Sequence, residues 1–496
     1  MKHTVRSVTW LLLAAAILTA GVSCGETASE AGGKTNDTQA VQTDAVTEEP
    51  EDSLAARMKV DDGVPTVDYA GKTFNILGDD ACEDYYTMEA QTGDVLDDSI
   101  FQRNAALEER FNIKITAQVR EETQLTPTLK ASVMAGDDEF QLFAGHIIYA
   151  GMAICDGLYY NWYDVPGIDF SKPWWSDSNV QDLTYDGLAF LAMGDFALTT
   201  IDSTYCFYFN KQIAADYDLP DMYQLVNDGK WTADKLIEIS KDIYRDLNGD
   251  GVADENDFYG YAIGARSPIN VYLWSFGEKL GKQQPDGTVI MDYFNDKVVD
   301  IYSKLYDMTW GSEGVFVRYK VDDFTLPDDM FVNNQVLFLP EVFRFADQDL
   351  RDFNTDYGII PYPKWDEAQT DYYTMVDGGH EGLAIPASAQ ELEFVGAITE
   401  ALNAESWKRV VPTYYDIVLK TKGTRDEVSV SMLDYILQHR IFDFGYVYGQ
   451  FGAAFWPQYL AEKKTADISS YYEKNHKAFD KTMTKVFEFF DTYDKD

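Results

Sequence analysis

The sequence predicts an α/β protein whose folded part contains two α/β regions. Segments that alternate apolar and polar residues, as strands do, are separated by segments with helical periodicity. Between residues 69 and 144 the order strand–helix–strand–helix–strand is typical of a parallel sheet covered by helices. After the first 57 residues about 440 remain, which is enough for two domains with hydrophobic cores.

The first 24 residues have the layout of a secretory signal. Two basic residues precede an apolar run over 10–20, and small residues lead to Cys24. The run is too short to span a bilayer comfortably, so a permanent transmembrane helix is not expected. Cys24, preceded by Ser23, stands where a bacterial lipoprotein carries its lipid. We therefore predict a lipoprotein signal peptide over 1–24. The alternative is ordinary secretion with Cys24 just inside the signal.

Residues 25–57 are predicted to be a disordered acidic tether. They contain no aromatic residue and almost no large aliphatic residue. Such a segment cannot bury enough apolar surface to offset the entropy cost of ordering. As a flexible coil it would span about 30 Å root-mean-square. The predicted location is therefore the outer face of the cytoplasmic membrane, with an exported body anchored through Cys24.

The charge of the chain excludes one class of partner. The formal net charge is −44 at pH 7, so phosphate backbones repel the protein and nucleic acid is excluded as a partner. The acidity favours solubility and cation binding at clustered carboxylates. No stretch after the signal reaches 18 consecutive apolar residues, so no other segment is expected to cross a membrane.

The remaining cysteines are not spaced as a metal or redox motif. Besides Cys24 the chain contains Cys82, Cys155 and Cys206, which is an odd number. An exported protein of this size does not need a disulfide. Buried free thiols are expected, and one bridge among the three is left open.

The first α/β region begins after the tether. Phe74 and Ile76 alternate with polar neighbours, as in a strand, and Ile100, Leu107 and Phe111 fall on one helical face. The predicted elements are a strand at 69–77, a helix near 98–111, a strand at 112–119, a helix through Leu125, Leu129 and Val133, and a strand at 139–144.

The second α/β region begins after about residue 200. The segment 204–209 is strongly strand-like, and a helix follows Trp231 with Thr232 as its N-cap. Further strands are predicted at 258–263 and 335–339. The last helix has the clearest period: its apolar residues at i, i+4, i+7 and i+11 are Phe479, Met483, Val486 and Phe490.

The segment 246–257 has the spacing of a calcium-binding loop. Oxygen side chains stand at positions 1, 3, 5, 9 and 12, and Gly251 stands at position 6, where the chain must turn sharply. The predicted Ca²⁺ ligands are Asp246, Asn248, Asp250, the carbonyl of Val252, Asp254 and Asp257. Asp257 replaces the usual Glu, which lowers the expected affinity. The ion would be a structural clip on a helix-to-strand turn; the alternative is a turn rich in Asp, Asn and Gly that holds no ion.

Several short segments occur in an order typical of one known family. They are YAGKTF at 69–74, Arg103-Asn104 before 108–111, 135–138, Phe209-Asn-Lys211, Trp231-Thr232, 357–364, 382–386 and 412–416. Through them, nearly the whole chain resembles bacterial extracellular solute-binding proteins of the sugar-binding, maltodextrin-receptor-like family, which are the capture components of ABC importers. The signal, tether and acidity agree with this resemblance.

The resemblance implies a two-lobe periplasmic-binding-protein-like fold with a hinge and an interlobe cleft. Crossings between the lobes are expected near 200–205 and 374–378, and a third after 412–416. The first lobe is expected at 58–200 plus about 378–415, and the second at 201–377 plus about 416–496. Both lobes would then be built from non-contiguous pieces.

The resemblance also implies a function and a site. The protein would capture a carbohydrate, preferably an oligosaccharide, by lobe closure and deliver it to an ABC permease in the membrane; a monomer is expected. Aromatic rings would stack on sugar faces, and polar side chains would bond the hydroxyl groups. The predicted ligand-binding residues are Trp456, Trp274, Asn270, His146, Asp202, Glu341, Arg344 and Asp377.

Each of these residues also has a structural alternative. Trp274 and Trp456 are compatible with ordinary core packing, Glu341 and Arg344 with a mutual pair on a helical turn, and Asp377 with a turn before two glycines. No GxSxG, HExxH or Walker motif is present, so an enzyme is not expected. The alternative functions are a surface glycan-binding adhesin and a glycan-active enzyme.

Overall fold

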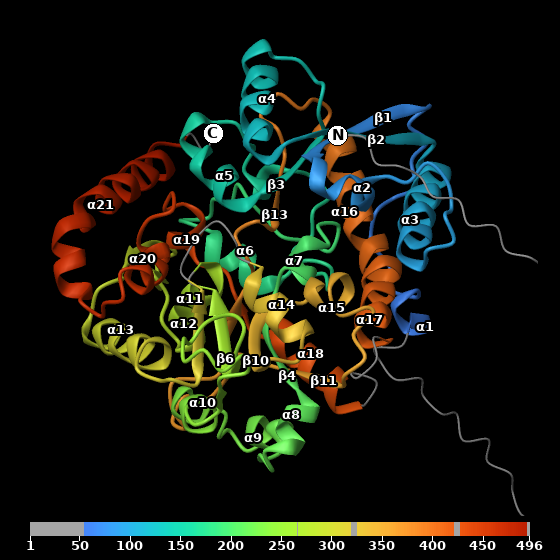
Figure 1. The fold of residues 1–496 in the computed structure, drawn as a ribbon. Helices are drawn as coiled ribbons and strands as arrows, with labels where there is room; N and C mark the ends of the chain where they lie inside the picture. The colour runs from blue at the N-terminus through green and yellow to red at the C-terminus, as the bar shows by residue number, and fades with distance from the viewer. Residues whose placement is uncertain (1–53, 265, 319–324, 421–426, 494–496) are drawn as a thin grey trace, which may run out of the picture. The chain divides into compact units, whose positions relative to one another are not determined.

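The computed structural model describes most of the chain after the predicted tether (Figure 1). The described residues are 54–264, 266–318, 325–420 and 427–493. Cys24, the predicted signal and residues 25–53 lie outside them. Leu54–Arg57, the last four residues of the predicted tether, form a helical turn (α1), and the Arg57 guanidinium lies 5.0 Å from the ring of Trp407. The predicted tether therefore extended too far toward the folded body.

The first sheet contains the three strands predicted for the first α/β region. Its order is β13-β3-β1-β2, and β1 pairs in parallel with both β2 and β3. The fourth strand, β13, comes from much later in the chain and pairs antiparallel with β3. The strands are β1 (Lys72–Asp79), β2 (Ile113–Arg120), β3 (Leu142–His146) and β13 (Glu381–Ala384). The prediction of a parallel α/β arrangement is confirmed here.

The second sheet is mixed. Its order is β11-β4-β10-β6-β5, with β9 also pairing to β6. Every residue of β4 is buried, as its apolar sequence predicts. The strands are β4 (Tyr205–Asn210), β5 (Tyr244–Arg245), β6 (Phe258–Gly264), β9 (Val315–Arg318), β10 (Val336–Val342) and β11 (Tyr357–Ile360). Two short pairs complete the strands: β7 (Gly281–Gln283) with β8 (Val289–Met291), and β12 (Thr374–Met375) with β14 (Arg440–Ile441).

Several helices begin or end at residues with local capping signals. In α3 the side chain of Asp94 accepts hydrogen bonds from the first turn, and Asn112 ends the helix with a left-handed φ of 48°. Thr232 caps α10 by accepting from the N–H of Lys235, as predicted. The four residues of the predicted C-terminal stripe are all buried in α21.

The remaining helices of the described chain follow in sequence order. Up to residue 240 they are α2 (Glu83–Tyr86), α3 (Val95–Phe111), α4 (Glu122–Ala135), α5 (Ile147–Met152), α6 (Asp177–Leu183), α7 (Thr199–Asp202), α8 (Lys211–Asp216), α9 (Met222–Asn227) and α10 (Ala233–Ser240). After it they are α11 (Ser267–Asn270), α12 (Tyr272–Ser275), α13 (Asp296–Thr309), α14 (Leu326–Val332), α15 (Arg344–Gln348), α16 (Leu392–Glu405), α17 (Val411–Lys420), α18 (Glu427–Gln438), α19 (Phe444–Val447), α20 (Trp456–Glu462) and α21 (Ile468–Thr492). Among the described residues, no helix is both long enough and apolar enough to cross a bilayer.

Two of the predicted crossing segments lie side by side. The N–H of Asp377 donates to the carbonyl of Ser203 at 2.8 Å, and the hydroxyl of Thr374 donates to the carbonyl of Tyr205 at 2.8 Å. The third predicted crossing, after 412–416, falls on the helix α17, which contacts both α3 and α15. The exact bounds of the two lobes remain a prediction.

Two local expectations differ from the structure. The loop over 246–257 follows β5, which pairs antiparallel with β6, so it connects two strands instead of a helix and a strand. A two-residue strand is too short to leave a period in the sequence. Cys82, Cys155 and Cys206 are all free thiols; Cys206 is buried as expected, whereas Cys82 is half-buried and Cys155 is exposed, so the expected burial is wrong for Cys155 and only partly right for Cys82.

Candidate functional site

A large cavity among the described residues lies where strands of both sheets end. It has a volume of about 910 Å³. The first sheet contributes residues at the ends of β1 and β3, and the second sheet contributes residues at the ends of β6 and β10. Ligands of open α/β sheets bind outside the carboxyl ends of the strands, so this is the position that the fold favours for a ligand.

Five of the eight predicted ligand-binding residues line this cavity. They are His146, Asp202, Glu341, Arg344 and Asp377. They come from the end of β3, from α7, from β10, from the start of α15 and from the segment after β12. The fold therefore brings together groups that are widely separated in the sequence.

Asp202 and Arg344 belong to one polar network at the first crossing. The carboxylate of Asp202 accepts from the hydroxyl of Tyr85 at 3.1 Å and from that of Ser203 at 2.6 Å. Arg344 donates to the Ser203 hydroxyl at 3.1 Å, and its Nη1 lies 3.9 Å from Asp202 Oδ1. Burial raises the pKa of Asp202, while the positive charge of Arg344 opposes that rise.

Asp377 is held at the second crossing by hydrogen bonds. Its carboxylate accepts from the Tyr205 hydroxyl at 2.8 Å and from the Gly379 N–H at 2.9 Å. Burial raises the pKa of Asp377, but these bonds and the charge of Arg344 outweigh burial, so the pKa lies below its usual value. Asp377 is therefore ionised at neutral pH and links both crossing segments to the cavity.

Glu341 and His146 have pKa values shifted by burial. Burial raises the pKa of Glu341, the Val342 N–H and the charge of Arg344 oppose that rise, and the nearby carboxylates of Asp377 and Asp349 add to it. Burial lowers the pKa of His146, which keeps its imidazole neutral at pH 7. The ring nitrogen Nε2 of His146 lies 3.9 Å from a carboxylate oxygen of Glu122.

The other three predicted ligand-binding residues are packed in the core and do not line the cavity. Trp274 is 1% exposed, and its indole N–H donates to Asp443 at 3.1 Å. Trp456 is 4% exposed and packs edge-on against Tyr293, Tyr471 and Tyr472.

Asn270 exchanges two hydrogen bonds with Gln458, at 2.9 and 3.1 Å. Asn270 and Trp274 form hydrogen bonds within the protein, and Trp456 packs against aromatic rings. We therefore leave Trp274, Trp456 and Asn270 out of the proposed site. The sequence does not distinguish a core tryptophan from one that stacks on a ligand.

Several residues that line the cavity were missed from the sequence. The acidic ones are Asp79, Asp80, Glu121, Glu122, Asp328 and Asp349, and Tyr85, Arg266 and Ser267 also belong to the lining. A signal for some of them was present. Asp79 and Asp80 directly follow the first predicted strand, and Arg266 and Ser267 follow the strand at 258–263, where the ends of strands in an α/β sheet converge.

The predicted calcium loop is held by its own hydrogen bonds. The carboxylate of Asp246 accepts from the N–H groups of Gly249 and Gly251 at 2.6 and 2.9 Å, and Gly251 has a left-handed φ of 73°. Asp257 accepts from the Leu247 N–H and the Tyr244 hydroxyl. The described residues place no three His, Cys, Asp or Glu side chains where they could hold a metal ion together.

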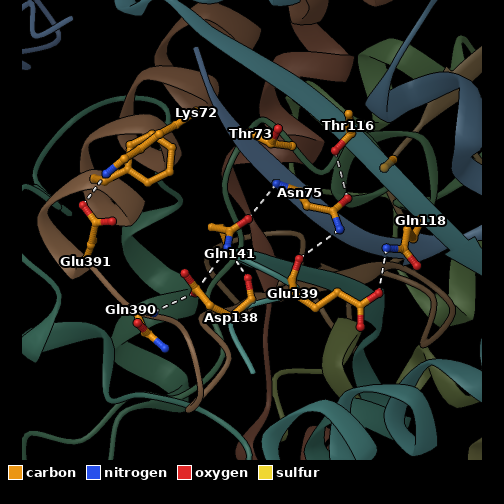
Figure 2. A pocket seen from close by; sticks show the side chains of 12 residues that line it. Lys72, Thr73, Asn75, Thr116, Gln118, Asp138, Glu139, Gln141, Gln390 and Glu391 are labelled. Atoms are coloured by element: carbon orange, nitrogen blue, oxygen red, sulfur yellow. Dashed lines mark hydrogen bonds and ion pairs between the residues drawn. The ribbon is translucent and has the colours of Figure 1, made fainter. Parts of the chain in front are cut away.

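A second, smaller cavity lies beside β1 and β2 (Figure 2). Its volume is about 500 Å³, and its polar groups bond one another. Gln141 accepts from the Asn75 N–H at 2.8 Å, and Gln118 donates to Glu139 at 2.9 Å. Lys72 forms an ion pair with Glu391. Because these groups are already satisfied and no predicted ligand-binding residue lies here, we place the candidate site in the larger cavity.

Comparisons with known proteins show the fold. No protein-family model matches the chain, and no curated protein matches it. A cyclo/maltodextrin-binding protein complexed with maltotetraose has a TM-score of 0.54 at 12% identity, over 86% of this chain and 99% of that one. An ABC substrate-binding protein from Listeria monocytogenes in complex with cycloalternan has a TM-score of 0.53 at 13% identity, over 84% and 99%.

UgpB from Mycobacterium tuberculosis in complex with glycerophosphocholine is similar to the same degree. Its TM-score is 0.53 at 14% identity, over 84% of this chain and 99% of that one. Each alignment takes in nearly the whole solved structure and most of this chain. The chain therefore has the α/β fold of the two-lobe solute-binding proteins.

Proposed function

We propose that this protein is an extracytoplasmic solute-binding receptor of an ABC transporter. It captures a carbohydrate, preferably an oligosaccharide, by lobe closure and delivers it to a membrane permease. The observation that carries this proposal is the cavity of about 910 Å³, which strands of both sheets line at their carboxyl ends. Two of the similar structures are a cyclo/maltodextrin-binding protein complexed with maltotetraose and an ABC substrate-binding protein in complex with cycloalternan.

The cavity contains the groups that a carbohydrate requires. The carboxylates and the Arg344 guanidinium can form hydrogen bonds with sugar hydroxyl groups. The rings of Tyr85, Tyr205 and Phe345 provide apolar surface for sugar faces. A ligand that contacts both sheets favours the closed state by its extra contacts there. The paired crossing segments at Ser203–Tyr205 and Thr374–Asp377 are where the hinge motion would occur.

We further propose that the protein is a monomer anchored through Cys24 at the outer face of the cytoplasmic membrane. This part rests on the signal layout and on the composition of the tether. The partner would be an ABC permease. Labelling with a radioactive fatty acid tests the anchor: wild type should take up label, and Cys24→Ser should not.

The ligand can be found by a thermal-shift screen of soluble glycans, followed by calorimetry on each hit. A receptor should bind a glycan without converting it. Product formation from the hit would favour the enzyme alternative. Retention on an insoluble glycan, with no soluble ligand, would favour the adhesin.

Filling the cavity should block binding whatever the ligand is. Gly264 lines the cavity at the end of β6, and a Cβ atom built there meets nothing within 4 Å. Gly264→Trp is expected to weaken binding of the glycan found in the screen by at least about tenfold, which is about 1.4 kcal/mol. The measurement is calorimetric titration.

Gly264→Ala is the matched control, because it changes the same backbone position without filling the space. It should bind within about threefold of wild type. Both variants should keep the far-ultraviolet circular dichroism of wild type. Unchanged affinity in Gly264→Trp would place the ligand outside this cavity.

A structural calcium ion in the loop at 246–257 remains a separate proposal, supported by the spacing of its oxygen side chains. Calcium should raise the melting temperature of wild type and a chelator should lower it, because an ion that binds only the folded state stabilises that state. Asp246→Ala should abolish the calcium response. If calcium and chelator both leave the wild-type melting temperature unchanged, the loop holds no ion.

A further inference from the structure

We propose that the ligand of the large cavity is positively charged: the cavity selects a carbohydrate that bears at least one free amine. This inference rests on the proposed function and narrows its ligand class. The evidence is the charge of the cavity wall, its distribution over both sheets and the scarcity of aromatic surface.

The described lining of the cavity is strongly acidic. It contains nine carboxylate side chains and two guanidinium groups. His146 adds no positive charge at pH 7, because burial lowers its pKa. Like charges that face one enclosed volume produce a field that attracts a cation into it. A neutral sugar gains no electrostatic attraction from that field.

The carboxylates lie on both walls of the cavity and affect one another. At the start of α4, burial raises the pKa of Glu122, and the carboxylate of Asp79 on β1 raises it further. In α14, burial raises the pKa of Asp328, and the carboxylate of Glu341 on β10 raises it further. A cation placed between such groups would relieve their mutual repulsion. This relief is available only to a ligand that carries the charge itself.

Arg344 offsets this repulsion only in part. Arg344 donates to Ser203 at 3.1 Å and lies 3.9 Å from Asp202. The charges of Asp202, Asp377 and Glu341 raise the pKa of Arg344 against the effect of burial. The single charge of Arg344 is thus shared among three carboxylates, and the described lining still holds nine carboxylate side chains against two guanidinium groups.

A metal ion is a poorer occupant than an organic cation. A metal ion needs several ligands that converge on one point. No three acidic, His or Cys side chains of the described chain converge in that way. Carboxylates spread along two walls suit a ligand whose amines and hydroxyls are distributed over several sugar units.

The ring content of the lining agrees with this ligand. Among the described lining residues, Tyr85, Tyr205 and Phe345 are aromatic and tryptophan is absent. Stacking on sugar faces is therefore limited, and hydrogen-bonding and charged groups dominate. The combination favours a hydroxylated ligand with positive charge over a neutral oligosaccharide and over a polyamine without hydroxyl groups.

The test compares ligands that differ only in charge. Calorimetric titrations use the full mature chain in low-salt buffer on the acid side of the amine pKa. The probes are the β-1,4-linked glucosamine trimer, its fully N-acetylated counterpart, maltotriose and spermidine. The glucosamine trimer is expected to bind at least about tenfold more tightly than the N-acetylated trimer, and added salt should reduce that preference.

The other outcomes separate this inference from the proposed function. If maltotriose or the N-acetylated trimer binds as tightly as the glucosamine trimer, the inference is overturned and the receptor function stands. If no carbohydrate binds, the proposed function fails and the inference fails with it. If spermidine binds as tightly as the glucosamine trimer, the carbohydrate part of both proposals is overturned.

A variant assigns the preference to the cavity wall. The double variant Asp328→Asn, Glu341→Gln keeps the shape of both side chains and removes their ability to ionise when a cation binds. It is expected to lose most of the preference for the glucosamine trimer over the N-acetylated trimer. The double variant Glu473→Gln, Glu488→Gln replaces two exposed carboxylates on α21 outside the cavity; it is the matched control and should keep the preference. An unchanged preference in the Asp328→Asn, Glu341→Gln variant would remove these two groups from the site.

Discussion

Replacing Glu400 with alanine is expected to lower the free energy of unfolding by about 3–5 kcal/mol. Glu400 is fully buried in α16, and its two carboxylate oxygens accept the indole N–H groups of Trp174 and Trp175, each at 2.8 Å. Both indoles are almost fully buried, so neither N–H can turn to water when the carboxylate is removed. The variant leaves two buried donors without partners and a cavity beside them. Chemical denaturation followed by circular dichroism measures the loss.

Two further variants separate the hydrogen bonds from the packing. Glu400→Gln fills the same volume but retains one acceptor oxygen, so its cost should be about 1–3 kcal/mol. Trp175→Phe removes one donor, and in that background Glu400→Gln should cost less than it does in wild type. A double-mutant cycle measures this coupling directly. If Glu400→Ala and Glu400→Gln are equally destabilising, or if the cycle shows no coupling, the two indole bonds do not stabilise the fold as proposed.

Acidification should destabilise the protein through His380 by about 3 kcal/mol. His380 is 1% exposed and lies directly after the second crossing segment, with Nδ1 2.5 Å from the carbonyl oxygen of Asp377. Burial lowers the pKa of His380 to about 4, and the positive charge of Arg440 and the neighbouring His146 also lower it, whereas Asp377 opposes the shift. In the unfolded chain the pKa is about 6.5.

The sign follows from where the proton binds. Between about pH 6.5 and pH 4 the unfolded state takes up a proton that the folded state excludes, so stability falls as the pH is lowered through this window. Above about pH 6.5 His380 is neutral in both states, so the free energy of unfolding is not reduced by its protonation. Free energies of unfolding measured across the window should fall more steeply for wild type than for His380→Gln, which cannot titrate. Parallel pH profiles for the two proteins would contradict the assignment, since the other titrating groups are shared.

The local structure could be predicted where one face of an element is apolar. Phe479 and Phe490 are buried in α21 because apolar residues with helical spacing form a stripe on one face, and that face packs against the core. Thr232 caps α10 because its hydroxyl reaches an N–H three residues later. The two-residue strand β5 could not be predicted, because it leaves no period.

The site could be predicted only in part. Asp202 and Asp377 line the cavity, as expected of residues in crossing segments that the resemblance placed at the hinge. Trp274 and Asn270 do not line it, because their partners come from distant segments: Gln458 is 188 residues from Asn270, and Asp443 is 169 residues from Trp274. A buried tryptophan looks the same in sequence whether a protein side chain or a ligand covers it.

By itself the sequence determined the α/β class, several of the strands and helices, the acidity and the layout of the N-terminal signal. These features depend on residue type and on spacing within one segment. Only the tertiary structure decided which carboxylates line the large cavity and which aromatic rings pack in the core. The physical reason is that charge repulsion, burial and hydrogen bonding at a site depend on distances between segments far apart in the chain, and no local pattern records those distances.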